Sequence, residues 1–305
     1  MKEPENTGVT PPSQNRIYSQ AVRQSPEFMS FQVDFAVCLK ELKNYCGMIL
    51  AGNFISPDEL VEKAASMIRP GQTTIDFFDM LHNMRHVDDS IYVHSLNVAL
   101  ITRMIGKWLK LSAPDMQLLT LCGLLHDIGK SLIPDDLLNK QDRLTDEEYD
   151  LLCQHAQFGY DLLRPLPLDP RVKNAALMHH ERCDGSGYPA KSTTDDIDDF
   201  AQIIAIADVY DAMTAARAYR APLCPFQVIS EFEKDGLSKY KPKFILTFLE
   251  RIASAYQNNH VLLNDGRAAN IVLLNRQRLS RPLVQLDNGE CIDLAKCDLY
   301  IASLI

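Results

Sequence analysis

Hydrophobic and polar positions along most of the chain follow the period of an α-helix. In the segment 28–50, FMSFQVDFAVCLKELKNYCGMIL, apolar residues recur at spacings of three and four, which predicts an amphipathic helix. Ser56 and Pro57 are typical of the start of a second helix, because serine caps free N–H groups and proline suits the first turn. We expect a third helix from about residue 73 or 74 to about residue 85.

The helical pattern continues through the middle of the chain. Long helices are expected at 91–111 and from Ser112 to about His126. Thr145 and Glu148 have the spacing of a capping box, which opens a further helix that contains His155. Helices at about 170–181 and 199–217, separated by a glycine-rich loop, complete a mainly α fold.

From about residue 258 the pattern becomes that of β-strands. HVLLNDGRAANIVLLN predicts two strands around an Asn-Asp-Gly turn, and RPLVQLDNGECIDL repeats the pattern around Asp-Asn-Gly. We therefore expect a small antiparallel β appendage at 258–305. Residues 1–26 are rich in Pro, Ser, Asn, Gln and Thr, which predicts a disordered tail. Between these ends we expect a helical segment of unknown role at 27–86 and a main helical domain at 87–257.

Composition narrows the classes of function. The 305 residues are 46% hydrophobic and 23% charged, an ordinary globular balance with no apolar run of the ~18–20 residues that span a bilayer. The N-terminus has no apolar core of a signal peptide, so a cytoplasmic protein without a membrane partner is expected. A net charge of -9 disfavours a nucleic-acid polymer as partner but leaves a small phosphate ester open. The eight scattered cysteines, with no CxxC pair, predict free thiols.

The candidate chemistry gathers in one block of the chain. Five of the eight histidines fall there: His94, His126, His155, His179 and His180. His126 is followed directly by Asp127 at the end of an apolar helix. Because neighbouring residues on a helix differ by 100° in direction, these two can share a metal only at a helix end or in a cleft. Alone, this pair is weak evidence.

The segment HHERCDGSGYP at 179–189 is more specific. It places two histidines and Glu181 before a loop whose glycines let the backbone approach a ligand closely. A surface turn with incidental histidines is the alternative. That alternative explains poorly why the histidines follow the apolar stretch NAALM, because buried imidazoles need partners, and metal coordination can supply them.

A third element, IIAIADVYDAMTAARAYR at 203–220, carries two carboxylates on one helical face, Asp208 and Asp211. A carboxylate within an apolar run is costly unless it is paired or bound to a metal. An ion-pair network with Arg217 and Arg220 is the alternative reading of this set.

Together these segments resemble the HD-GYP phosphodiesterases, a branch of the HD-domain metallohydrolases that degrades cyclic di-GMP. The resemblance covers about residues 88–257 and rests on motifs in the family's order: HSLNVAL (94–100), HDIGK (126–130), HAQFG (155–159), HHERCDGSGYP (179–189) and IADVYDAMTAARAYR (206–220). HDIGK indicates only the broad superfamily, whereas the pattern HHExxDGxGYP is specific to this branch.

The resemblance implies a mainly α, HD-domain helical bundle and a full set of site residues. Its implied metal ligands are His94, His126, Asp127, His155, His179, His180 and Asp208, with Asp127 bridging two metals and acting with Lys130 in catalysis. Its implied substrate-binding residues are Lys130, Tyr188, Arg217 and Arg220. Glu181, Asp184 and Asp211 are implied to organise the loop and support the ligands.

Imidazole and carboxylate ligands suit iron or manganese, so we expect two divalent transition metal ions. In the family a third metal needs a glutamate four residues before the first histidine, where this chain has Ser90, so a third metal is not expected. The chain departs from the family pattern at three further places that bear on guanine recognition and turnover. Cys183 replaces the motif's frequent tryptophan, Ala216 and Ala218 flank Arg217 in place of Asp and Pro, and Lys241-Pro242 replaces a later Asp-Pro.

The expected activity is hydrolysis of cyclic di-GMP to linear pGpG, with GMP left open as a further product. A catalytically weak or inactive sensor of cyclic di-GMP, or an interaction module for a GGDEF-domain protein, is the alternative. A different HD hydrolase acting on a related cyclic dinucleotide is a third reading, which the intact GYP loop argues against. Residues 27–86 could offer the surface of a homodimer.

Overall fold

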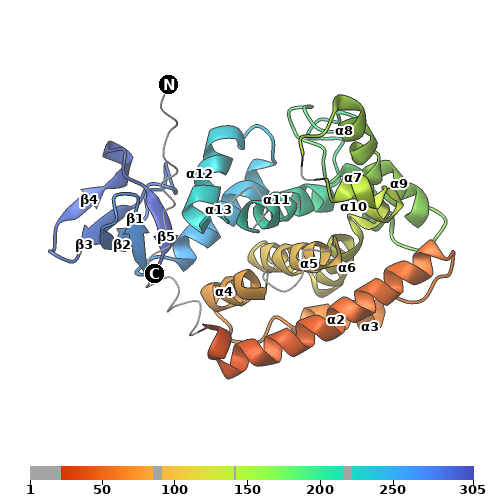
Figure 1. Ribbon diagram of the computed structural model, residues 1–305, viewed down its shortest axis with the longest axis horizontal. Helices are drawn as coiled ribbons and strands as arrows, with labels where there is room; N and C mark the ends of the chain where they lie inside the picture. Colours follow the sequence, from red (N-terminus) through yellow and green to blue (C-terminus); the bar gives the residue numbers. More distant parts are fainter. Residues whose placement is uncertain (1–21, 85–90, 141, 216–221) are drawn as a thin grey trace.

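The computed structural model describes residues 22–84, 91–140, 142–215 and 222–305. A body of helices carries a small antiparallel sheet at one end (Figure 1), which confirms the predicted fold class. The helices in chain order are α2 (Pro26–Leu50), α3 (Asp58–Ser66), α4 (Thr74–Met84), α5 (Ile91–Trp108), α6 (Ala113–Leu125), η1 (Ile128–Leu132), α7 (Asp135–Leu138), α8 (Asp146–Cys153), α9 (His155–Leu163), α10 (Pro170–Met178), α11 (Asp199–Thr214), α12 (Pro225–Asp235), α13 (Pro242–Ala255) and η2 (Leu294–Lys296).

Local capping signals in the sequence set several of the helix starts. Ser112 Oγ accepts a hydrogen bond from the backbone N–H of Asp115 (3.3 Å) and so caps α6. The predicted capping box of α8 is present, because Thr145 Oγ1 accepts from Glu148 N (3.2 Å) and Glu148 Oε2 accepts from Thr145 N (2.8 Å). α3 starts at Asp58, one residue after the predicted start, and Ser56 Oγ still accepts from Asp58 N (3.4 Å).

Two predicted helices end earlier than the sequence pattern suggested. α10 ends at Met178 rather than near residue 181, because Glu181 N donates to the Met178 carbonyl (2.9 Å) and turns the chain. α11 ends at Thr214 rather than at 217, with Ala215 in an extended conformation. The early end of α10 places His179 and His180 in the turn that follows the helix.

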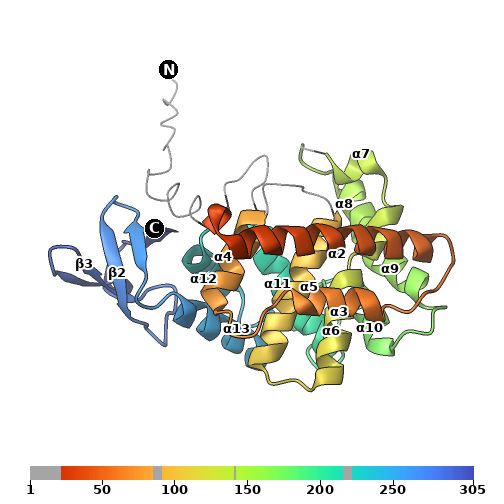
Figure 2. The same ribbon diagram turned by 90° about the horizontal axis from the view of Figure 1, so that it is seen from below.

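The core is centred on α5 and α11, which lie side by side in the middle of the helical body (Figure 1). Both helices bury residues on nearly all sides. An aromatic group joins α4, α11 and α13, in which Phe78 and Phe248 each lie edge-on to Tyr210, with ring centroids 5.4 and 5.2 Å away. α2 runs along the outside of this body (Figure 2) and packs one face against it. The expected helical segment at the N-terminus thus shares the core of the main body.

The C-terminal strands form a five-stranded antiparallel sheet in the order β4-β3-β2-β1-β5. The strands are β1 (His260–Leu263), β2 (Ala268–Leu273), β3 (Leu283–Leu286), β4 (Cys291–Asp293) and β5 (Ile301–Leu304). Gly266 and Gly289 adopt φ values of 87° and 86° in the two predicted turns, a conformation that favours glycine. Alternate residues such as Val261 and Ile271 are buried, so one face of the sheet is apolar.

The described helices do not include one that is long and apolar enough to cross a membrane. All eight cysteines are free thiols, as the sequence predicted. The division of the chain at residues 26, 86 and 257 stays a prediction.

A matched pair of glycine substitutions tests the packing of α5 on α6. A Cβ at Gly123 would lie 2.6 Å from the Ala99 Cα, whereas a Cβ at Gly47 on α2 would meet nothing within 4 Å. We expect Gly123→Ala to destabilise the fold by about 1–3 kcal/mol through overpacking. Thermal unfolding should show a Tm lower by several degrees, at roughly 2–4 °C per kcal/mol.

Gly47→Ala is the control and should be neutral or stabilise the fold by about 0.5–1 kcal/mol, because alanine favours a helix interior. A Gly123→Ala protein with the Tm of the Gly47→Ala protein would show that α5 and α6 are not in close contact.

Candidate metal centre

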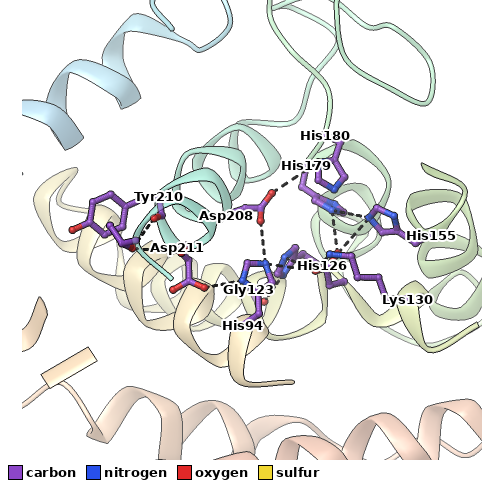
Figure 3. A network of polar contacts seen from close by, with 12 residues as sticks. His94, Gly123, His126, Lys130, His155, His179, His180, Asp208, Tyr210 and Asp211 are labelled. Carbon is purple, nitrogen blue, oxygen red and sulfur yellow. Dashed lines mark hydrogen bonds and ion pairs between the residues drawn. The ribbon is translucent and has the colours of Figure 1, made fainter. Parts of the chain in front are cut away.

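All seven predicted metal ligands converge on one place in the helical body (Figure 3). Five separate segments bring them there: the start of α5, the junction of α6 with η1, the first residue of α9, the turn after α10 and the middle of α11. The residues in that order are His94, His126 with Asp127, His155, His179 with His180, and Asp208. Most of these residues lie at helix ends. Because His126 and Asp127 follow the last residue of α6, both of these adjacent side chains can reach the centre.

The carboxylate of Asp127 lies at the middle of the cluster and is 1% exposed. Its distances to the imidazole nitrogens are 3.3 Å to His155 Nε2 and 3.5 Å to His179 Nε2 from Oδ1, and 3.4 Å to His126 Nε2 and 3.6 Å to His94 Nε2 from Oδ2. Two groups of donor atoms, each close enough together to hold a metal ion, therefore share this residue. One is Asp127 with His155, His179 and His180, and the other is Asp127 with His94 and His126.

Backbone carbonyls fix the orientation of three of the imidazole rings. Each Nδ1 donates to the carbonyl three or four residues before it: His126 to Gly123 (2.8 Å), His155 to Leu152 (2.7 Å) and His179 to Ala175 (3.0 Å). Because Nδ1 carries the proton in each neutral ring, Nε2 carries a lone pair. The three lone pairs face Asp127, an arrangement that suits a cation.

A carboxylate on α11 orients the ring of His94 in the same way. His94 Nδ1 donates to Asp211 Oδ2 (2.8 Å), and its Nε2 lies 3.0 Å from Asp208 Oδ1. Burial alone would lower the pKa of His94, but the hydrogen bonds to the two aspartates raise the pKa to about 10. Asp211 thus fixes the ring so that Nε2 faces Asp208 and Asp127, where a bound metal ion would take the place of the Nε2 proton.

The charge states of the other groups are set by burial and by Lys130. Burial would raise the pKa of Asp127, yet the ammonium of Lys130, 2.6 Å from Oδ2, and His126 hold that pKa well below its ordinary value. Burial lowers the pKa of His155 to about 4. Burial also lowers the pKa of His179. The pKa of His180 is lowered by burial and by the neighbouring His179. The ionised carboxylate of Asp127 and the neutral imidazoles of His155, His179 and His180 are the forms that bind metals.

Two orphaned polar atoms show that the site fits a metal. His126 Nε2 and Asp127 Oδ1 are buried and have no hydrogen-bond partner among the described residues. Leaving such atoms unsatisfied costs free energy, and native proteins rarely do so without a reason. A cation held between imidazole nitrogens and a carboxylate would satisfy both atoms at once. His/Asp donors of this kind suit divalent transition metals.

The loop after α10 places an aromatic ring beside the cluster. Tyr188 stacks on the imidazole of His180, with ring centroids 4.6 Å apart and planes 26° apart. The buried Glu181 holds the loop by accepting hydrogen bonds from the backbone N–H groups of Ala190 (2.6 Å) and Ser192 (3.0 Å). Further out, Asp184 Oδ1 accepts from the backbone N–H of Ser186 (3.0 Å). Glu181 and Asp184 thus each accept hydrogen bonds from backbone N–H groups of this loop, and their role in organising it stays a prediction.

Sequence reasoning missed one pair of glycines at the site. A Cβ at Gly129 would collide with the carbonyl oxygen of His155 and the backbone nitrogen of Gly159. The close contact of η1 with α9 therefore depends on Gly129, and it brings His155 up to Asp127. The signal was present in the sequence, because HDIGK and HAQFG each place a glycine three or four residues after a histidine.

Three predicted positions cannot be placed in the site. Arg217 and Arg220, expected to bind substrate phosphates, and Ser90, on which the two-metal expectation rests, all lie outside the described residues.

Comparison with known proteins identifies the family of this chain. The family model described as HD domain matches residues 80–244, more than half of the chain. The chain belongs to the HD domain family. The matched region contains every ligand of the cluster, from His94 to Asp208.

Similar proteins carry names from cyclic dinucleotide signalling. A cyclic di-GMP phosphodiesterase of Pseudomonas aeruginosa is 32% identical over 235 residues, which cover 75% of this chain and 54% of that protein. A 3'3'-cGAMP-specific phosphodiesterase of Vibrio cholerae is 33% identical over 159 residues, covering 52% of this chain and 30% of that protein. This HD-domain chain thus spans about half the length, or less, of these relatives.

Solved structures also resemble this chain. Bd1817, a HDG"Y"P protein from Bdellovibrio bacteriovorus, superposes with a TM-score of 0.52 at 19% identity, covering 80% of this chain and 73% of the other. At this level of identity the likeness supports the helical architecture alone.

The contact between His94 and Asp211 gives a testable prediction. A carboxylate that orients a metal-binding histidine typically contributes 10–100-fold to metal affinity. We expect Asp211→Asn to weaken Mn²⁺ binding by roughly that factor, as measured by calorimetric titration of metal-free protein. Asp161→Asn, at a half-exposed carboxylate on α9, is the control and should bind like the parent. Unchanged affinity in Asp211→Asn would contradict the orienting role.

Proposed function

We propose that this HD-domain protein is a metal-dependent phosphodiesterase that hydrolyses cyclic di-GMP. The observation that carries the proposal is the buried carboxylate of Asp127, which belongs to two ligand groups at once. A shared carboxylate is what a pair of neighbouring metal ions requires, and such pairs catalyse displacement at phosphorus.

The residues divide into two sets around the shared carboxylate. His155, His179 and His180 would hold one ion with Asp127, and His94 and His126 would hold the other. Asp208 lies between the sets, 3.0 Å from His94 Nε2 and 3.9 Å from His180 Nδ1. We propose iron or manganese for both ions and no third ion, since Ser90 stands where a third ion would need a carboxylate. The bound pair would supply hydroxide at neutral pH and neutralise charge on the phosphate.

The chain's own side chains would prepare the substrate. The side chain of Lys130 is 21% exposed, and its Nζ is paired with Asp127. It would place a positive charge at the edge of the cluster, where phosphate oxygens gain negative charge. Tyr188 covers the ring of His180 and offers a flat surface to the ligand. Arg217 and Arg220 are proposed to bind the phosphates. Fixed cations of this kind would let an acidic protein bind a ligand with two phosphates.

The proposed substrate class follows from the site together with the relatives' names. Relatives named for cyclic di-GMP and for 3'3'-cGAMP align with this chain. Cyclic di-GMP is the substrate we propose, with linear pGpG as product and GMP as a possible second product. The complete set of seven ligands favours an enzyme over an inactive sensor or a GGDEF-binding module. A protein that only binds would be expected to have lost at least one of them.

Product analysis tests the proposal. We expect manganese- or iron-loaded protein, under reducing conditions, to convert cyclic di-GMP to pGpG, as separated by chromatography. Asp127→Ala should lower turnover by at least about 10³-fold, because it removes the group shared by both ligand sets. Asp161→Ala is the control and should be active, and circular dichroism should show a helical fold for both variants. An active Asp127→Ala protein, or binding of cyclic di-GMP by parent protein without product, would contradict the proposal.

Metal removal gives an independent prediction. Chelation should abolish turnover, and manganese or iron should restore it, with two ions per chain by elemental analysis. Because only the folded chain binds the ions tightly, metal at 100 times its Kd should stabilise the fold by about 2.7 kcal/mol per site and raise Tm. Three ions per chain, or a Tm unaffected by chelation, would contradict the two-metal site.

A further inference from the structure

A cavity of about 340 Å³ lies between α3, α5 and α6. These three helices pack beside one another (Figure 2). The cavity is lined by the second half of α5, the turn after it, the end of α3 and the start of α6. Lys107 on its wall lies about 20 Å beyond His94 along α5, at roughly 1.5 Å per residue. The cavity is therefore separate from the metal centre.

The charge of this cavity is opposite to that of the chain. Four basic residues line it: Arg69, Arg103, Lys107 and Lys110. None of its lining residues within the described part of the chain is acidic, although the protein as a whole has a net charge of -9. Several like charges around one concave surface create a positive potential that attracts an anion.

Three of these cations form no ion pair in the described structure. Arg69 contacts Asp34 (3.4 Å), but Arg103 donates only to neutral oxygens, Thr120 Oγ1 (3.0 Å) and the Met116 carbonyl (3.4 Å). Burial lowers the pKa of Arg103, so its charge is held at a cost. Within the described ranges, Lys107 and Lys110 have no carboxylate within ion-pair distance.

The backbone conformation of Lys110, one of the basic residues of the cavity, is unusual. Lys110 adopts φ 58° at the end of α5, a left-handed position that glycine fills with less strain. The chain closes this turn through a hydrogen bond from Leu111 N to the Gly106 carbonyl (3.0 Å). A long cationic side chain thus occupies a strained position beside the cavity.

The remaining wall of the cavity is apolar. Ile68, Leu111 and Met116 contribute side chains to it. A bare inorganic ion would leave this apolar surface uncovered. A ligand with an anionic group and an apolar or flat body would contact both the basic residues and the apolar wall. A volume near 340 Å³ lies within the range of small-molecule sites.

We propose that this cavity binds a phosphate monoester of mononucleotide size, with Arg103, Lys107 and Lys110 around the phosphate and the apolar wall against the rest of the ligand. The proposal does not depend on the activity of the metal centre.

Calorimetric titration of the full-length, metal-loaded protein with adenosine 5'-monophosphate tests this site. We expect binding that weakens by at least about tenfold in the double variant Lys107→Gln with Lys110→Gln, because charge-assisted hydrogen bonds to the phosphate are lost. Both lysines are exposed and glutamine keeps part of each stem, so the variant should keep the parent Tm.

The matched control is Lys234→Gln with Lys243→Gln, which removes the same charge from exposed positions on α12 and α13. This control should bind the nucleotide like the parent. Adenosine has no phosphate, so it should not bind in the cavity of the parent or of the control. Four results would overturn the proposal: no binding at millimolar nucleotide, equal binding by the Lys107/Lys110 variant and the parent, equal weakening in the control, or adenosine binding as tightly as the monophosphate.

Discussion

The buried carboxylate of Asp127 is the constraint on which the rest of the site depends. An ionised group that is 1% exposed is costly in a protein interior unless opposite charge compensates it. Lys130 compensates one oxygen, and the other oxygen faces the Nε2 atoms of His155 and His179, whose Nδ1 atoms donate to backbone carbonyls. Such an arrangement is strained without a cation and satisfied with one. The energetics of the protein interior and the chemistry of the site therefore point to the same metal centre.

Helix ends explain how one carboxylate meets so many ligands. A residue in mid-helix shares its surroundings with neighbours three and four positions away, whereas a helix end can direct successive side chains to one point. His126 and His179 each follow the last residue of a helix, and His155 is the first residue of α9. Each fixes its ring on a carbonyl in the last turn of the helix before it. The close contact at Gly129 then brings two of these ends together. The helical body as a whole thus serves to hold five chain segments at fixed distances.

Much of this could be predicted from the sequence, because the relevant rules are local. Period and capping residues predicted the helices, as the capping box at Thr145 shows, and the Asn-Asp-Gly pattern predicted the first hairpin turn. The motif residues were predicted to converge only through resemblance to a family, since no local rule links His94 to Asp208. The contact at Gly129 was missed because it depends on a tertiary approach of two helices. The early end of α10 was missed because a turn competes with an otherwise helical pattern.

The central claim is that Asp127 lies between two metal ions. The most direct test is a crystal structure of manganese-loaded protein with anomalous diffraction data collected near the manganese edge. The account predicts two anomalous peaks, one on each side of the Asp127 carboxylate, the first against His155, His179 and His180 and the second against His94 and His126. No peak at this carboxylate, or peaks bound only by other residues, would contradict it.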